Sequence, residues 1–231
     1  MSAPDLRGER AVATDGAPII KSKHRVKNYG EVFTPPHMVN TMLDLVKDDL
    51  EFVDHTFLEP AAGDGNFLVA ILKRKFRTVE KYYNPEFWGQ EALFAVASVY
   101  GIELLADNHA DAQAAMLEAA VAFHDAHKIR CGPRTLQYMA AKFLIEKNII
   151  QGNTLTGKNV DGRPIEFSWW NRVKNFPGYV EREPFTLSSL AQSARDSDEG
   201  MLFSLADFAP VSHRTYLRCP INHVHKEMAT P

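Results

Sequence analysis

Cysteine is scarce in this sequence: Cys131 and Cys219 are the only two, and they stand far apart without a Cys-x-x-Cys spacing. A disulfide framework and a zinc knuckle are therefore excluded, and a reducing cytoplasm is the expected location. No run approaches the roughly 18 apolar residues that a membrane span needs, which excludes integral membrane proteins and predicts no membrane partner. A large excess of charge of one sign is also lacking, because the formal net charge is only −3. The chain as a whole has no strongly positive field of the kind that announces a nucleic-acid binder.

What is present is an ordinary globular composition, with 45% hydrophobic and 24% charged residues among 231. This composition allows one sizeable domain. Two short basic clusters, at Lys21–Lys27 and Lys73–Arg77, are interpreted as solvated surface charge, with phosphate contact as the alternative. Residues 1–22 lack the apolar block of a secretory signal and are expected to be a flexible leader. The polar, punctuated segment 191–231 is expected to be a loosely ordered tail.

Between these ends, short apolar segments alternate with helical patterns. Apolar residues that recur every three or four positions predict a helix over 37–50, with Met38, Met42, Leu45 and Val46 on its buried stripe. Further helices are expected over 66–83, 110–129 and 134–148, and strands over 56–58, 99–105 and 148–151. This order predicts an α/β fold, a parallel sheet with helices on both faces, because parallel neighbours need long crossover connections. A further strand, Ile165–Trp170, is expected after a loop or hairpin.

Gly63 and Gly65 follow the first strand at the point where the next helix begins. Glycine lets the backbone bend sharply and lets a ligand approach closely, and such turns lie at the ligand-binding carboxyl edge of a parallel sheet. Helix N–H groups near Asn66 offer donors to an anionic group. A dinucleotide fingerprint would need a third glycine where Leu68 stands, and the lysine of a phosphate-binding Walker loop is also missing.

Glu103 ends the second expected strand, which is otherwise apolar. A carboxylate at that edge can accept two hydrogen bonds from ribose hydroxyls. Taken alone, the glycines could be an ordinary turn and Glu103 a surface acid. Their order along one strand–helix–strand unit predicts a nucleoside site.

Four segments, read in order, resemble a known family: "GEVFTPPHMVNTMLDLV" (30–46), "FLEPAAGDGNFL" (57–68), "YGIELLADN" (100–108) and "NIIQGNTL" (148–155). They are similar to the cofactor half of S-adenosylmethionine-dependent DNA adenine N6-methyltransferases of the restriction-modification and phage type. The resemblance covers residues 23–155. It implies a Rossmann-like class I methyltransferase sheet, shortened in its carboxyl half, within a domain over 23–190. It also implies S-adenosylmethionine as cofactor and DNA as partner.

The resemblance also implies a role for each matching position. Thr34 and Pro35 would line the methionine end of the cofactor, and Phe67 would pack nearby. Glu103 would hold the ribose, and Asn153 would stand where the family usually has an aspartate that reads the adenine amino group. An asparagine can still accept there through its side-chain oxygen. The floor beneath the cofactor would be formed by Glu59, Pro60, Ala61, Gly63 and Gly65.

The sequence departs from the family at the catalytic loop. The family polarises the adenine amine with an Asp/Asn/Ser-Pro-Pro-aromatic motif, and its aromatic ring stacks on the flipped base. The nearest candidate here is "NFPGY" with Asn175, Pro177 and Tyr179, which carries one residue too many and also fits an ordinary Pro-Gly turn. Trp169 and Trp170 could instead offer a stacking face, although tandem tryptophans are more typical of cores.

Several functions remain open at this point. The first hypothesis is adenine N6 methylation of DNA, with orientation of the reactants as the main contribution of the protein. Cytosine C5 methylation is disfavoured because neither cysteine follows a proline. The rival is a catalytically silent methyltransferase-like subunit that works with a specificity or nuclease subunit, and the fold also allows methylation of a protein or small molecule. His213, His223 and His225 lack an acidic or cysteine companion, so no metal site is expected.

Overall fold

The computed structural model describes residues 21–29, 34–189 and 216–226. The chain forms two compact units, residues 1–47 and 48–231. The expected flexible leader therefore lies almost entirely outside the described residues. The same holds for residues 30–33 of the "GEVFTPP" segment, for His213 and for most of the expected tail.

The first unit contains two helices, α1 (Lys23–Tyr29) and α2 (Pro36–Asp44). Pro35 is extended and Pro36 starts α2, as the backbone restrictions of a Pro-Pro pair require. The single helix expected over 37–50 is wrong, because α2 ends at Asp44 and a separate short helix, α3, spans Lys47–Leu50.

The expected buried stripe of α2 is also wrong. Met38 and Met42 are half exposed and Leu45 is 84% exposed, whereas Val39 and Leu43 are buried. Val39 and Leu43 are also four residues apart. Spacing alone therefore fits two stripes that differ by one position, and it could not decide between them.

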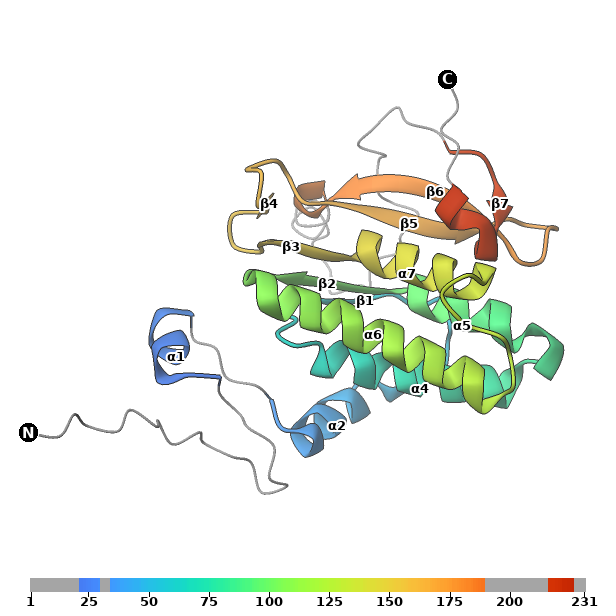
Figure 1. The fold of residues 1–231 in the computed structure, drawn as a ribbon, viewed down its shortest axis with the longest axis horizontal. Helices are drawn as coiled ribbons and strands as arrows, with labels where there is room; N and C mark the ends of the chain where they lie inside the picture. Colours follow the sequence, from blue (N-terminus) through green and yellow to red (C-terminus); the bar gives the residue numbers. More distant parts are fainter. Residues whose placement is uncertain (1–20, 30–33, 190–215, 227–231) are drawn as a thin grey trace, which may run out of the picture. The chain divides into compact units, whose positions relative to one another are not determined.

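The second unit is built on a sheet with the strand order β1-β2-β3-β4 (Figure 1). Strands β1 (Phe57–Glu59), β2 (Val99–Glu103) and β3 (Ile149–Asn153) are parallel, and β4 (Lys158–Asn159) is antiparallel to β3. The expected alternation of parallel strands and helices is confirmed. The connecting helices are α4 (Asn66–Tyr82), η1 (Pro85–Phe87), α5 (Trp88–Ala97), α6 (Ala106–Ala126) and α7 (Leu136–Asn148).

The parallel strands advance in one direction, from β1 to β2 to β3. Right-handed crossovers that all step the same way place their helices on the same face of a sheet. Gly101 accordingly faces α4, where a β-carbon would lie 3.1 Å from Leu68. Tyr100, which precedes Gly101 in β2, points to the opposite face. The expectation of helices on both faces is therefore wrong for the described sheet.

A second sheet covers the Tyr100 face. It consists of β5 (Glu166–Arg172), β6 (Tyr179–Thr186) and β7 (Cys219–Pro220), all antiparallel. The Tyr100 hydroxyl donates to the carbonyl of Ser168 at 2.9 Å, and its ring meets Phe185 and Trp169 edge-on. Trp169 and Phe185 stack with centroids 3.8 Å apart. The aromatic hairpin thus takes the place of a second helical layer.

Part of the segment expected as a loose tail belongs to this fold. After β7 comes η3 (Ile221–Lys226), whose Ile221 and Val224 are buried. Figure 1 shows this turn beside α7. Within the described ranges, no helix has the combined length and hydropathy that a bilayer-spanning segment requires.

Candidate functional site

The turn after β1 closes against the end of β2. The backbone N–H of Ala62 donates to the carbonyl of Ile102 at 2.9 Å, which continues the strand pairing into the turn. Within the turn, the N–H of Ala61 donates to Oε1 of Glu59 at 3.1 Å. Burial raises the pKa of the Glu59 carboxyl, and the Ala61 hydrogen bond lowers it by a smaller amount.

Glu103 meets this turn directly. Its Oε2 accepts the backbone N–H of Gly63 at 2.8 Å, and its Oε1 accepts the N–H of Leu105 at 2.8 Å. The side chain is buried, with 7% of the residue exposed. A carboxylate offers about four lone-pair positions, so each oxygen keeps one acceptor position beyond its backbone partner. The predicted proximity of the glycine turn and the strand-end carboxylate is confirmed.

The two glycines are required by the backbone, although not for the reason expected at Gly65. Gly63 has φ +57° and Gly65 has φ +93°, both in the left-handed region that favours glycine. A β-carbon on Gly65 would lie 2.9 Å from the Cα of Ala112 in α6. The space that this glycine leaves is therefore occupied by a helix, and the close approach is one of helix packing.

The end of β3 completes the same edge. The hydroxyl of Thr154 donates to the carbonyl of Pro60 at 2.5 Å and ties the loop after β3 to the turn after β1. Asn153 stands next to this link, but its Oδ1 accepts the N–H groups of Leu155 and Thr156 at 2.9 and 3.2 Å. Both lone pairs of that oxygen are engaged, so the expected acceptor role is not available in this conformation. The Nδ2 amide, which can only donate, is the group that remains.

The other predicted cofactor residues lie outside this turn in the sequence. Phe67 is the second residue of α4 and is half buried. Thr34 and Pro35 belong to the first unit, where Pro35 precedes α2. Their roles at the methionine end remain predictions. The structure therefore brings together Glu59, Pro60, Ala61, Gly63, Glu103 and Asn153 at the carboxyl edge of the sheet.

The candidate catalytic loop lies elsewhere. Residues 173–178 form the turn between β5 and β6, with Asn175 at φ +64° and Gly178 at φ +81°. Gly178 lies against Gln90 in the first turn of α5, the helix that leads into the start of β2. This loop is therefore at the amino edge of the sheet, and Figure 1 shows it at the right, opposite β4 and the end of β3. Asn175, Pro177 and Tyr179 do not meet the Gly63–Glu103 turn.

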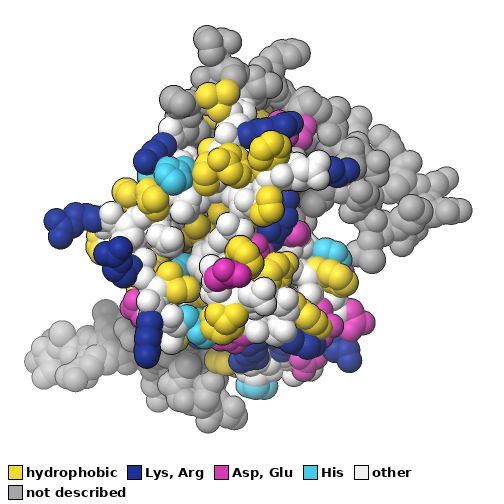
Figure 2. All heavy atoms as spheres, turned by 90° about the vertical axis from the view of Figure 1, so that its right-hand side faces the viewer, with side chains coloured by type: hydrophobic (Ala, Val, Ile, Leu, Met, Phe, Trp, Pro, Cys, Tyr) yellow, Lys and Arg dark blue, Asp and Glu magenta, His cyan; other side chains and the backbone are white. Residues whose placement is uncertain are grey.

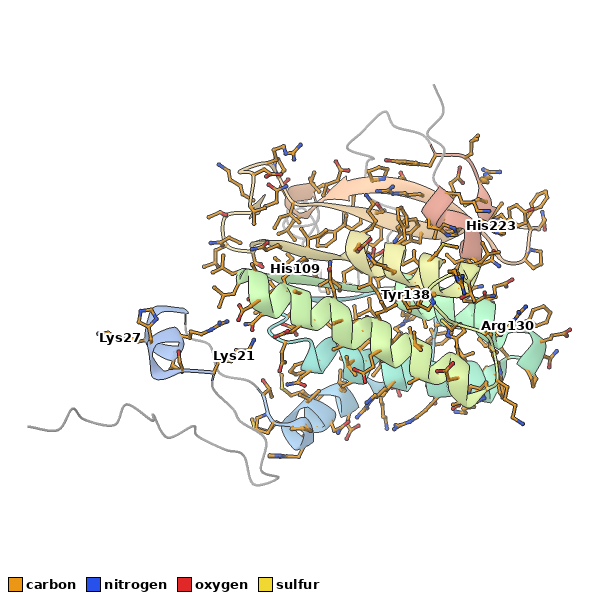
Figure 3. All side chains as sticks on the ribbon, viewed as in Figure 1. Lys21, Lys27, His109, Arg130, Tyr138 and His223 are labelled. Carbon is orange, nitrogen blue, oxygen red and sulfur yellow. The ribbon has the colours of Figure 1, made fainter. Side chains whose placement is uncertain are left out.

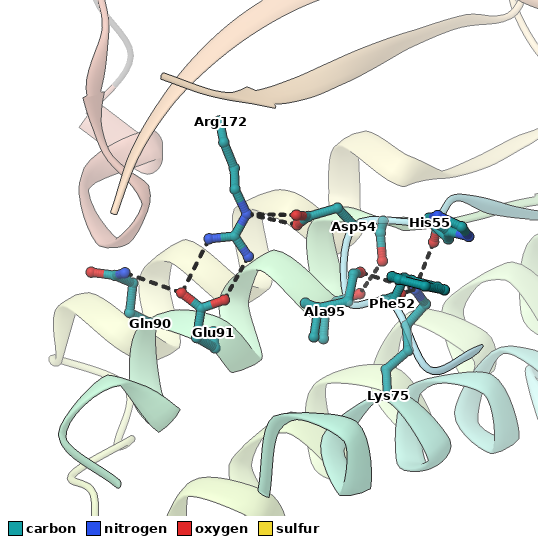
Figure 4. Close-up of polar contacts among 10 residues, drawn as sticks. Phe52, Asp54, His55, Lys75, Gln90, Glu91, Ala95 and Arg172 are labelled. Carbon is teal, nitrogen blue, oxygen red and sulfur yellow. Dashed lines mark hydrogen bonds and ion pairs between the residues drawn. The ribbon is translucent and has the colours of Figure 1, made fainter. Parts of the chain in front are cut away.

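Sequence reasoning missed an ion cluster at this amino edge (Figure 4). Arg172 donates through Nη1 and Nη2 to the two oxygens of Glu91 at 3.1 and 2.5 Å, and its Nε lies 2.8 Å from both oxygens of Asp54. Its guanidinium also stacks 3.7 Å from the centroid of the Phe94 ring. These acids raise the pKa of Arg172 even though burial lowers it. No local pattern joins these residues, because they come from three distant segments.

Lys75 contradicts the expectation of a solvated basic cluster over Lys73–Arg77. Its side chain is fully buried, and Nζ donates to the carbonyls of Phe52, Val53 and His55 at 3.1, 2.9 and 2.6 Å. Burial lowers the pKa of Lys75 to about 7. Its i, i+4 position after Ile71 on the buried stripe of α4 was the available signal, but a lysine is normally expected at the surface.

A carboxylate with two spare acceptor positions beside a bent backbone suits a ligand with two neighbouring hydroxyl groups. The ribose of S-adenosylmethionine is such a group, so the free acceptor positions of Glu103 fit the cofactor that the resemblance implies. Within the described ranges, no three His, Cys, Asp or Glu side chains gather as metal ligands would. His109, labelled in Figure 3, has a structural contact instead, since its Nε2 lies 2.8 Å from the carbonyl oxygen of Ile149.

Comparison with known proteins agrees with the sequence resemblance over its amino-terminal part. Residues 21–127 match the family model described as N-6 DNA Methylase. This range contains α2, β1, the glycine turn, β2 and the whole of α6. Neither the curated proteins nor the solved structures contain a match to the chain. Residues 21–127, which include Gly63 and Glu103, are therefore similar to the N-6 DNA methylase family.

Proposed function

We propose that this chain is an S-adenosylmethionine-dependent DNA methyltransferase that acts on adenine N6. The observation that supports this proposal best is the 2.8 Å hydrogen bond from the N–H of Gly63 to Oε2 of Glu103. It joins the two sequence features expected of a nucleoside site, and both lie inside the matched range 21–127. The chain's free cysteines, Cys131 and Cys219, fit a reducing cytoplasm.

In this proposal Glu103 orients the cofactor. Two backbone donors fix the Glu103 carboxylate, and its remaining lone pairs would accept from the two ribose hydroxyls. The side-chain Nδ2 of Asn153 would be the group that donates to the cofactor's adenine. The bound cofactor supplies an electrophilic methyl group, and the chain's own contribution is to hold the two reactants in line and to exclude water.

Two measurements test the proposal. Calorimetric titration with S-adenosylmethionine should show one saturable site, and Glu103→Gln should weaken binding by about tenfold or more, since a hydrogen bond to a charged group is lost. Glu118→Ala, which removes an exposed carboxylate on α6, is the matched control and should bind normally. Incubation with methyl-labelled cofactor and mixed-sequence DNA should yield N6-methyladenine after digestion to nucleosides. Cofactor binding without any methylated adenine would reject the catalytic part of the proposal.

A second candidate is supported by a separate observation. The candidate catalytic loop, with Asn175, Pro177 and Tyr179, lies at the amino edge of the sheet, away from Glu103. In addition, the order of the described parallel strands is β1-β2-β3, without the reversal of strand order at which a substrate crevice forms. Both facts favour a catalytically silent subunit that binds the cofactor and works with a specificity or nuclease subunit. Methylation that appears only when such a subunit is added would favour this candidate over an independent enzyme.

A further inference from the structure

A hollow of about 330 Å³ lies between β6, β7 and η3, on the side of the molecule that Figure 2 faces. This volume is within the range of about 300–1,000 Å³ that ligand sites occupy. Its floor includes Trp170, Val180 and Val224, all of which are buried. Figure 3 labels His223, which lies on η3 and also borders the hollow.

The rim of the hollow is basic. Arg182, Arg218 and Lys226 line it, and its described lining contains no Asp or Glu. Figure 2 shows Lys and Arg side chains beside hydrophobic ones on the upper part of this face. An apolar floor inside a basic rim suits a ligand that is flat and apolar in one part and anionic in another.

Arg182 is held rigidly in this rim. Its guanidinium lies 4.4 Å from the centroid of the Tyr216 ring and 5.3 Å from that of Trp170, and its Nε donates to Oγ of Ser168 at 2.7 Å. The aromatic contacts keep the guanidinium plane in place over the floor. Arg is well suited to such a position, because a planar cation can stack on rings and contact phosphate together.

Arg218 is bound more loosely. Its Nη2 lies 3.1 Å from Oε2 of Glu181, and the two side chains are 58% and 45% exposed. Exposed pairs of this kind contribute little stability, so a phosphate can take the place of the carboxylate at small cost. Lys226 is exposed, and no ion pair holds it within the part of the chain that the structure describes.

We propose that this hollow is a docking site for single-stranded nucleic acid, in which an unpaired base packs against the Tyr216 ring beside the apolar floor and the flanking phosphates contact Arg218 and Lys226. Aromatic platforms next to basic grooves are how proteins bind single strands without strict sequence preference. The inference deepens the proposed function and rests on it for the choice of DNA. The site is separate from the Gly63–Glu103 turn and holds the strand without taking part in methyl transfer.

Fluorescence anisotropy with a short labelled single strand tests the phosphate contacts, using the full chain without S-adenosylmethionine. Arg218→Gln/Lys226→Gln should bind more weakly, and its plot of log affinity against log salt should be shallower by about 1.4, from about 0.7 per lost contact. The matched control is Lys81→Gln/Lys142→Gln, in which Lys81 pairs with Glu51 and has the same 58% side-chain exposure as Arg218. Equal affinity and equal salt dependence in both double variants would overturn the proposal.

A second pair of measurements tests the base contact. Tyr216→Ala should weaken binding of the single strand by about tenfold, in line with the loss of one stacking platform. An abasic strand, which has the phosphates without the bases, should bind the parent and Tyr216→Ala alike. A polyglutamate peptide that competes as well as the strand would show a protein-binding site and would overturn the nucleic-acid assignment.

These tests separate the inference from the proposed function. Arg218→Gln/Lys226→Gln should bind S-adenosylmethionine as the parent does, whereas Glu103→Gln should bind the single strand as the parent does. Strand binding without methyl transfer would contradict only the proposed enzyme. Methyl transfer that is unchanged in Arg218→Gln/Lys226→Gln, with unchanged strand affinity, would contradict only the docking site.

Discussion

Arg172 and Glu91 form a two-pronged ion pair that fastens the second sheet to α5. The side chain of Glu91 is 4% exposed, so Arg172 takes the place of water around its carboxylate, whereas Arg172 is 31% exposed. Removing one member of a buried pair leaves an unpaired charge inside the protein, which is more costly than the pair itself is stabilising.

Arg172→Ala should therefore lower the free energy of unfolding by about 3 kcal/mol, measured by urea denaturation. Arg163→Ala is the control, because Arg163 pairs with Asp161 at the surface with side-chain exposures of 74% and 57%. It should change the free energy by less than about 1 kcal/mol. The double variant Arg172→Met/Glu91→Leu should recover much of the lost stability. Equally small losses in the free energy of unfolding for Arg172→Ala and Arg163→Ala would show that the buried pair does not stabilise the packing of the second sheet on α5.

Lys75 should make stability depend on pH. Its pKa is about 7 in the folded protein, and the ordinary pKa of lysine is 10.5, so between these pH values the unfolded chain binds more protons. The contribution of Lys75 to the free energy of unfolding should therefore increase as the pH rises from 7 towards 10.5. Urea denaturation of the parent and Lys75→Met at several pH values should show a difference that grows with pH. Lys73→Met, at an exposed position on the same helix, should leave the pH dependence unchanged.

Gly65→Ala should destabilise the turn for two reasons. The residue has φ +93°, and its new β-carbon would lie 2.9 Å from the Cα of Ala112. Gly157→Ala is a matched control, because Gly157 has φ +65° and open space around it. Gly157→Ala should cost about 1 kcal/mol from the backbone alone, and Gly65→Ala should cost more, about 2–3 kcal/mol. Equal shifts in thermal unfolding would mean that α6 moves away without penalty.

Asn153→Asp tests which atom of this side chain faces a ligand. The carboxylate can still accept the N–H groups of Leu155 and Thr156, so the melting temperature should stay close to that of the parent. The substitution removes the Nδ2 donor, and calorimetry should therefore show weaker binding of S-adenosylmethionine. Tighter binding would contradict the assignment and would favour the acceptor role of the family's aspartate.

The strand–helix order and the Gly63–Glu103 contact could be predicted because both follow from local patterns. Glycines after an apolar strand indicate a turn, and the carboxyl ends of neighbouring parallel strands must meet at one edge. The unexpected role of Gly65 depended on the distant Ala112, which no local pattern indicates.

The missed features depend on contacts between distant segments. The aromatic hairpin could be expected as a strand, but its position over Tyr100 depends on the strands advancing in one direction. Lys75 has the periodicity of a core residue and the chemistry of a surface residue, and the three carbonyls that satisfy it lie some twenty residues earlier. The displacement of "NFPGY" from Glu103 follows from the hairpin geometry, which the motif itself does not encode.

The single-sided arrangement of the crossover helices has a consequence for folding order. The segment from β1 to β3 can pack against its own helices early in folding. The face of the sheet that carries Tyr100 then stays exposed to solvent until β5 and β6 pack against it. A sheet with one exposed apolar face would associate with other copies, and a fragment that ends after Asn153 is expected to aggregate. We therefore expect the β5–β6 hairpin to be needed for the solubility of the folding domain.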